Sequence, residues 1–125
     1  NWLLAAAPYC PDCRVFVPLI QKMAELNPNI RVNYIARNDF DDSSRFENPR
    51  QQEIVRANQK IPALFLMGHE EDGPVFNEFP QVVLNQIAVD ETRRTELRDA
   101  YRAGKFNTDI EAQIVAALAW AEQRC

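Results

Sequence analysis

The sequence has little of several features that mark large classes of proteins. Its three cysteines are too few, and odd in number, for a scaffold held together by disulfides. No apolar run approaches the roughly 20 residues that span a bilayer, so no membrane partner is expected. Lysine and arginine never exceed two in a row, and 14 of them against 18 acidic residues leave a net charge of −4. Because phosphate binding needs a basic surface, nucleic acid is not expected as a partner either.

The composition is otherwise that of a soluble globular protein. Apolar residues make up 46% of the 125 residues and charged residues 26%, values that argue against global disorder. A chain of this length fits one hydrophobic core, so we expect residues 1–125 to form a single domain. No signal peptide is visible after Asn1, and we expect a cytoplasmic monomer.

The first part of the chain predicts a strand, a helix and a second strand. Residues 1–7 are a short apolar run that stops at Pro8, which predicts a buried strand. Pro11 suits the first turn of a helix, and Asp12 in that turn complements the helix dipole. Residues 30–35 alternate in polarity and predict the second strand. The apolar residues that recur at helical spacing between the two strands are Val15, Phe16, Leu19, Ile20, Met23 and Leu26.

The rest of the chain predicts a second helix, a hairpin and three further helices. A polar loop over 37–48 leads to a helix over 49–58. Strands over 63–67 and 75–79 flank a polar turn, a pattern typical of a β-hairpin. The closing helices are expected over 80–89, from Asp90 as a cap to Gly104, and from a capping-box pattern at Thr108–Glu111 onward.

These elements give the order β-α-β-α-β-β-α-α-α, which belongs to the α/β class. Strands separated by helices predict parallel pairs, and the hairpin adds an antiparallel edge. We therefore expect a central mixed β-sheet flanked by helices, with extra helices at the C-terminal end. Within those extra helices, Leu97 and Tyr101 are expected to face the core.

The sharpest chemical feature of the sequence is the Cys10-Pro11-Asp12-Cys13 stretch at the start of a predicted helix. Residues three apart on a helix have Cβ atoms roughly 5–6 Å apart, and small adjustments bring such a pair within disulfide range. The N–H groups and positive dipole of a helix N-terminus favour a thiolate on the first cysteine. We therefore predict that Cys10 attacks a substrate disulfide and that Cys13 resolves the mixed disulfide. The redox-active pair holds the two electrons itself, so no bound cofactor is expected.

Two other interpretations of the cysteine pair remain open from the residues alone, a zinc half-site and a pair of inert buried thiols. Zinc would need two more ligands, and outside the carboxylates only His69 and Cys125 are available, so no metal is expected. His69 lies in a polar turn and is expected to be solvated, and Cys125 is expected to be unpaired. Asp39, Asp41 and Asp42 lack the glycine and distal glutamate of an EF-hand loop, so they predict a solvated loop.

The cysteine motif and a downstream proline carry a family resemblance. Residues 9–13 (YCPDC), with Pro18 after them, resemble the active-site helix of the thioredoxin superfamily. Ile61-Pro62 ahead of an apolar strand resembles the cis-proline that faces the cysteine pair in that family, and residues 101–106 resemble a bacterial branch of it. The resemblance implies a thioredoxin fold. It also implies a shallow groove for an extended peptide, with Tyr9, Pro11, Asp12, Ile61 and Pro62 as its substrate-binding residues.

The sequence departs from the family pattern in ways that bear on its chemistry. The strand and helix that precede the active-site strand in typical thioredoxins are not found ahead of Cys10, so we expect a shortened N-terminus. Their buried aspartate is replaced by apolar residues at 3–5, and the tryptophan before the first cysteine by Tyr9. Asp12, expected to be solvated, places a carboxylate near Cys10 and disfavours its thiolate, an effect that Arg14 partly offsets. This predicts a more reducing couple than in oxidants whose CxxC contains histidine.

The residues and the resemblance together predict a thiol–disulfide oxidoreductase of the thioredoxin-like kind, active in cell redox homeostasis. Its partners would be a disulfide-containing protein or small thiol, and a flavoprotein reductase or glutathione that recycles it. Three alternatives stay open. They are a glutaredoxin-like, glutathione-dependent reductase with Lys60 as its one candidate carboxylate contact, a redox-inactive binding module, and a cluster-binding dimer.

Overall fold

The computed structural model describes residues 1–123. Its helices and strands follow the predicted order: β1 (Trp2–Ala6), α1 (Pro11–Leu26), β2 (Val32–Ala36), α2 (Pro49–Asn58), β3 (Ala63–Leu66), β4 (Phe76–Asn77), α3 (Gln81–Val89), α4 (Arg94–Arg102) and α5 (Asn107–Glu122). Short 3₁₀ turns occupy parts of the connections, at Arg37–Asp39, Ser43–Arg45, Glu70–Asp72 and Glu91–Arg93. None of the helices within residues 1–123 is both long and apolar enough to cross a membrane.

The strands form one mixed sheet in the order β2-β1-β3-β4. β1 runs parallel to β2, with Leu4 opposite Tyr34. β3 runs antiparallel to both of its neighbours, with Ala5 opposite Ala63 and Leu64 opposite Phe76. The mixed sheet flanked by helices is the predicted α/β architecture.

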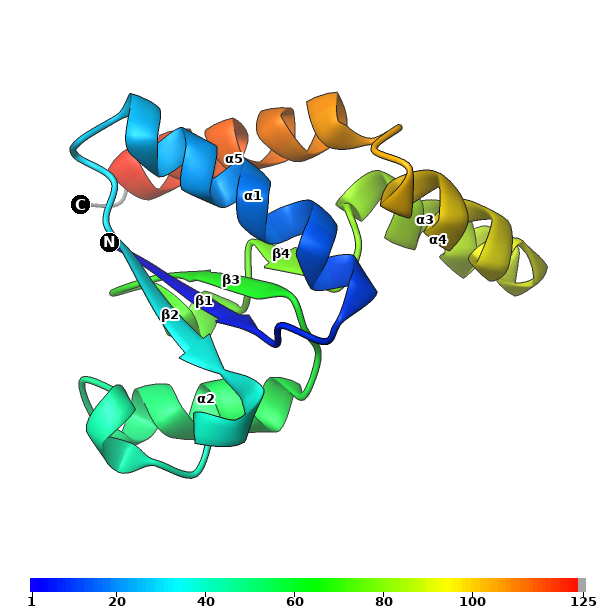
Figure 1. Cartoon of the computed structure of the whole chain (residues 1–125). Helices are drawn as coiled ribbons and strands as arrows, with labels where there is room; N and C mark the ends of the chain where they lie inside the picture. The colour runs from blue at the N-terminus through cyan, green and yellow to red at the C-terminus, as the bar shows by residue number, and fades with distance from the viewer. Residues whose placement is uncertain (124–125) are drawn as a thin grey trace.

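The direction of β3 corrects the expectation that strands separated by helices pair in parallel. That expectation holds for β1 and β2, whereas β3 lies beside β1 and runs against it. The cause is the polar segment 37–48, which carries the chain back along the sheet before α2 returns it (Figure 1). β3 therefore starts at the end of the sheet where β2 stops, and must run in the opposite direction.

Helices cover both faces of the sheet. α1 and α5 lie on one face and α2 on the other, while α3 and α4 sit beyond the end at which α1 starts (Figure 1). β1 is buried on both sides, as its unbroken apolar sequence predicts. Trp2 and Leu4 belong to the cluster with α1 and α5, and Leu3 and Ala5 to the cluster with α2, because alternate residues of a strand face opposite sides.

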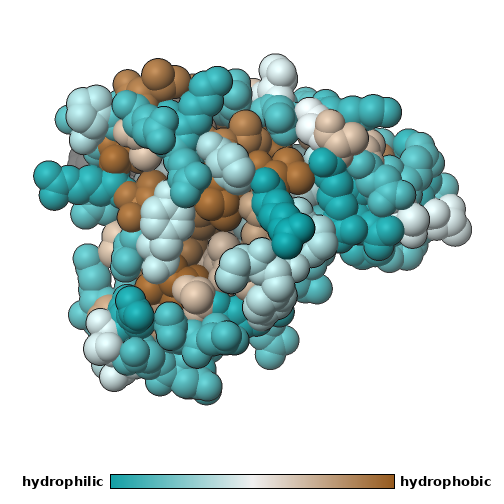
Figure 2. Space-filling model, viewed as in Figure 1, coloured by the Kyte–Doolittle hydropathy of each residue, from teal (hydrophilic) through white to brown (hydrophobic). Residues whose placement is uncertain are grey.

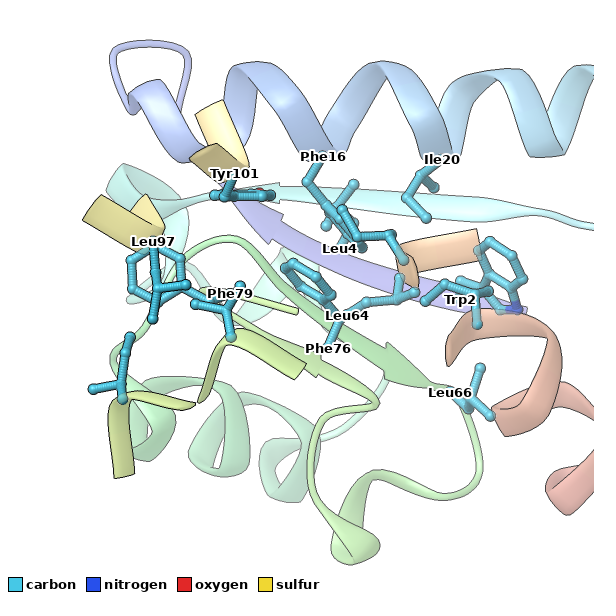
Figure 3. Packing of buried hydrophobic residues seen from close by; sticks show 14 residues of the cluster. Trp2, Leu4, Phe16, Ile20, Leu64, Leu66, Phe76, Phe79, Leu97 and Tyr101 are labelled. Carbon is cyan, nitrogen blue, oxygen red and sulfur yellow. The ribbon is translucent and has the colours of Figure 1, made fainter. Parts of the chain in front are cut away.

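The larger cluster joins the sheet to the C-terminal helices. Phe16 of α1 stacks on Phe76 of β4 with ring centroids 3.9 Å apart. Leu97 and Tyr101 reach into this cluster from α4, so their predicted inward orientation is confirmed (Figure 3). The edge of the Tyr101 ring meets Phe79 at 5.7 Å. α4 is therefore fixed to the core by the helix face that also approaches α1.

Two predicted helix starts have different outcomes. Asp90 caps only the 3₁₀ turn at Glu91–Arg93, where its carboxylate accepts from the N–H of Thr92 at 3.1 Å, whereas α4 itself begins at Arg94 with no side-chain cap. The predicted capping box at Thr108–Glu111 is wrong, because that motif does not start the helix. α5 already begins at Asn107, with no side-chain cap, because Phe106 packs on the core and its carbonyl accepts from the N–H of Ile110 at 2.9 Å. Thr108 therefore lies inside the first turn.

The return strand of the hairpin is shorter than the predicted 75–79. β4 covers Phe76–Asn77 alone, and Phe79 forms only an isolated bridge back to Asn77. The backbone of Glu78 has a φ of 69°, in the left-handed region, which turns the chain out of the extended conformation. The turn brings the N–H of Glu78 to the carbonyl of Pro62 at 2.7 Å.

Candidate active site

Cys10 sits at the N-cap of α1, in the connection that leaves the carboxyl end of β1. Its backbone is extended, with φ −85° and ψ 117°, and Pro11 follows at the first helical position. The Cys10 Sγ accepts from the backbone N–H of Cys13 at 3.4 Å. The sulfur is thus placed where the N–H groups and dipole of the helix favour negative charge. The predicted start of the helix at Pro11 is confirmed.

The two cysteines occupy different environments. Cys10 is partly exposed, whereas Cys13 is 2% exposed, and both are free thiols. Burial raises the pKa of the Cys13 thiol from its ordinary value of 9.0 to about 12, and the nearby Cys10 and Asp12 add smaller contributions in the same direction. Cys13 therefore keeps its proton at neutral pH while Cys10 is the sulfur that a substrate can reach.

Asp12 is buried, which corrects the expectation that it is solvated. It is 8% exposed, and its Oδ1 accepts from the Arg102 Nε at 2.8 Å. Its backbone carbonyl accepts from the hydroxyl of Tyr101, also at 2.8 Å. The reason is that α4 packs over the first turn of α1. The carboxylate is therefore compensated by Arg102 and not by Arg14, which is exposed.

Ile61 and Pro62 lie at the same end of the sheet as the cysteine pair. The peptide bond between them is cis. Ala63, the next residue, stands opposite Ala5 in the antiparallel pair, so Pro62 is level with Ala6 at the end of β1, just before the segment that leads to Cys10. Ile61 shares a buried cluster with Cys13, and Cys10 packs against that cluster.

The remaining residues expected at a substrate groove differ in exposure. Tyr9 is 60% exposed and Pro11 is also exposed, so both flank Cys10 on the surface. Ile61 and Pro62 are buried behind it. The fold thus brings Tyr9, Pro11 and Ile61 around the cysteine pair from two segments that are far apart in the sequence.

An apolar hollow of about 400 Å³ opens beside the pair, between α1 and β2. Its walls include Pro8, Cys13 and Val17 on the side of α1, and Tyr34 on β2. Figure 2 shows apolar side chains gathered on this face, between α1 and the strands. The hollow reaches the buried cysteine from the side of β2.

The other residues singled out from the sequence lie away from the pair or in ordinary contacts. His69 is only partly solvated, which corrects the expectation of a solvated side chain: it is 21% exposed, and its ring packs edge-on against Trp120 with centroids 5.3 Å apart. Lys60 Nζ lies 3.9 Å from a carboxylate oxygen of Glu78. Cys125 lies outside the described residues.

The aspartates of the polar loop are engaged in ion pairs. Asp39 pairs with Arg45 at 3.7 Å and Asp41 with Arg56 at 3.1 Å. The carboxylate of Asp42 accepts from the N–H of Ser44 at 3.1 Å. Among residues 1–123, no group of three or more His, Cys, Asp or Glu side chains is placed to hold a metal ion.

Tyr101 and Arg102 are the site residues that sequence reasoning missed. They lie 89 and 90 positions from Asp12. The sequence predicts Tyr101 only as a core residue and Arg102 only as part of the stretch 101–106 that resembles the family. A single sequence carries no periodicity or spacing that links residues so far apart. The ion pair could be found only from the fold.

A comparison with protein families shows to which family the chain belongs. A family model described as Thioredoxin matches residues 1–98. The chain belongs to the thioredoxin family. The part of this thioredoxin-family chain that matches carries the cysteine pair and Ile61-Pro62, and it ends within α4, before Tyr101. Comparison with curated proteins and with solved structures returned no significant match. Family membership supports a thioredoxin-like redox role in general.

Proposed function

We propose that the protein is a thiol–disulfide oxidoreductase that reduces protein disulfides through the Cys10/Cys13 pair. One observation carries the proposal. A partly exposed cysteine at a helix N-cap lies three residues before a buried one whose pKa is raised to about 12. The two sulfurs are therefore different in reactivity and close enough to act in sequence.

The reaction is a two-step exchange. The Cys10 thiolate attacks one sulfur of the substrate disulfide, which forms a mixed disulfide and releases the other sulfur as a thiolate. As Cys13 then attacks the Cys10 Sγ, its proton passes to that thiolate, and the second substrate sulfur is expelled as a thiolate that takes a proton from water. The substrate gains two electrons and becomes a dithiol, and the protein is left with a Cys10–Cys13 disulfide.

The surroundings of the pair support the binding of an extended peptide. Tyr9 and Pro11 offer exposed apolar surface beside Cys10, and Ile61-Pro62 forms the buried wall behind it. A disulfide-containing protein fits this surface, and a small thiol fits it as well. Electrons return from a flavoprotein reductase or from glutathione, and no bound cofactor is needed because the dithiol carries both electrons.

Reduction of a disulfide-linked protein by dithiothreitol, followed as turbidity when its chains separate, tests this function. We expect catalysis by the unaltered chain and none by Cys10→Ser. Cys13→Ser is expected to trap a mixed disulfide that mass spectrometry detects, because the resolving sulfur is gone. Cys125→Ser is the matched control and is expected to retain activity. Full activity of Cys10→Ser would contradict the proposal.

The same variants separate the glutathione-dependent alternative. A monothiol mechanism with glutathione survives the loss of the second cysteine, so Cys13→Ser would keep reducing a glutathione mixed disulfide. We expect it to lose that activity. A redox-inactive binding module, by contrast, would leave both cysteine variants equal to the unaltered chain in every redox assay.

A further inference from the structure

α4 ends directly against the turn that carries the cysteine pair. Two consecutive residues of its last turn, Tyr101 and Arg102, bond to the same residue of α1. The Tyr101 hydroxyl donates to the carbonyl of Asp12 at 2.8 Å, and the Arg102 Nε donates to its carboxylate at 2.8 Å. Tyr101 is fully buried against Phe79, so the position of Arg102 is fixed by the core.

Asp12 would be an unfavourable neighbour for a nucleophilic sulfur if it were unpaired. It lies between the two cysteines in the sequence, and Arg102 is close enough to both Asp12 and Cys10 for their charges to act on it. The Asp12 side chain is only 12% exposed, so water screens its charge poorly. A like charge at short range disfavours a thiolate. The guanidinium of Arg102 supplies the opposite charge, and the hydrogen bond to Asp12 in turn raises the pKa of Arg102, so the cation persists. The pair as a whole adds little net charge beside Cys10.

We propose that Arg102 is a positioning residue of the active site, which cancels the repulsion between Asp12 and the Cys10 thiolate and thereby makes the redox couple less reducing. This inference rests on the redox function proposed above. It also revises the prediction from the sequence, in which a solvated Asp12 acted on Cys10 with only Arg14 to offset it. Arg102 lies beyond residues 1–98, so the tuning group comes from outside the part of the chain that matches the family.

Among the described residues, few other titratable groups act on Cys10, Asp12 and Arg102. Cys13 lies on α1 with Asp12, and Tyr101 faces the cysteines from α4 with its pKa raised by burial. Asp99 acts on Arg102 from the same helix and is itself bonded by Arg98 at 3.3 Å. Arg98 therefore offers a matched control, one turn away on α4 and engaged with a different carboxylate.

The test uses Arg102→Gln, Arg102→Lys, Asp12→Asn, the double variant Asp12→Asn/Arg102→Gln, and Arg98→Gln. Two quantities are measured for each: the equilibrium constant of the Cys10–Cys13 couple against glutathione, and the pH at which half of Cys10 reacts as thiolate with an alkylating agent. For Arg102→Gln we expect the constant to move about threefold to tenfold toward the disulfide and the alkylation midpoint to rise. A tenfold change in the constant is about 30 mV.

The other variants are expected to shift the two quantities in the opposite direction or to leave them unchanged. Asp12→Asn leaves an uncompensated cation, so we expect a shift toward the dithiol and a lower midpoint. The double variant is expected within about twofold of the unaltered chain, because both charges are gone. Arg102→Lys keeps the positive charge, so we expect its equilibrium constant and alkylation midpoint to stay close to those of the unaltered chain. This result would show that the shift in Arg102→Gln comes from the lost charge and not from misfolding. Arg98→Gln is expected to change neither quantity.

Two results would overturn the inference in distinguishable ways. If the unaltered chain forms a reversible disulfide and Arg102→Gln matches it in both quantities, Arg102 only docks α4 and the proposed function still stands. If no reversible Cys10–Cys13 disulfide forms in the unaltered chain, the proposed function fails and the inference fails with it.

Discussion

The hydroxyl of Tyr101 donates a 2.8 Å hydrogen bond to the backbone carbonyl of Asp12, a residue 89 positions earlier in the chain. The contact is buried and ties the last turn of α4 to the first turn of the active-site helix. It sets the place of Arg102, the next residue, against the Asp12 carboxylate. The C-terminal helices thus form part of the surroundings of the cysteine pair.

Tyr101→Phe removes this hydrogen bond and keeps the aromatic ring. We expect the free energy of unfolding to fall by about 1 kcal/mol, the usual net value of one such bond. Urea denaturation measures it. Tyr34→Phe is the control, because Tyr34 is 44% exposed, and it is expected to stay within about 0.5 kcal/mol. Equal effects of the two substitutions would show that the Tyr101 hydroxyl contributes nothing specific.

Phe16→Ala tests the packing that holds the active-site helix on the sheet. Phe16 is fully buried and stacks on Phe76, so its loss leaves a cavity at the centre of the larger cluster (Figure 3). We expect a loss of about 3–5 kcal/mol in the free energy of unfolding. Leu26→Ala, at the exposed end of the same helix, is expected to cost less than about 0.5 kcal/mol. A loss below about 1 kcal/mol for Phe16→Ala would contradict the packing described.

The buried Cys13 predicts a pH dependence at alkaline pH. Its pKa rises from 9.0 in the unfolded chain to about 12 in the fold, so the fold prefers the protonated thiol. The associated stability is complete below pH 9.0 and is lost as pH rises toward about 12, because the unfolded chain releases the proton first. We expect Cys13→Ala to lose less stability than the unaltered chain over this range.

The rate of alkylation tests the burial of Cys13 independently of stability. In Cys10→Ser/Cys125→Ser, Cys13 is the one remaining cysteine. We expect it to react slowly at pH 9.0 in the folded chain and readily in urea, where burial no longer raises its pKa. Equal rates in the two conditions would mean that Cys13 is accessible in the fold.

Local patterns in the sequence predicted much of the fold. Apolar spacing placed α1, and Pro11 with Asp12 fixed its start, because helix periodicity and first-turn preferences act over a few residues. The order of the elements followed from the same kind of pattern. The antiparallel course of β3 did not, since it depends on the path of segment 37–48 in space.

The site was predictable only in part for the same reason. Cys10 and Cys13 are neighbours in the sequence, so their placement on one helical turn could be read from spacing. The burial of Asp12 and its bond to Arg102 depend on how α4 packs over α1, which no local pattern encodes. The shortened β4 likewise depends on the left-handed backbone of Glu78, a residue without a turn signature.

The reduction potential of the Cys10/Cys13 couple tests the central claim most directly. It is measured by equilibrating the chain with dithiol buffers and counting alkylated thiols by mass. We predict a reversible two-electron couple near the thioredoxin value of about −270 mV. A value near −120 mV would mark an oxidant and contradict the proposed direction of electron flow. Failure to form a Cys10–Cys13 disulfide in any buffer would contradict the oxidoreductase function itself.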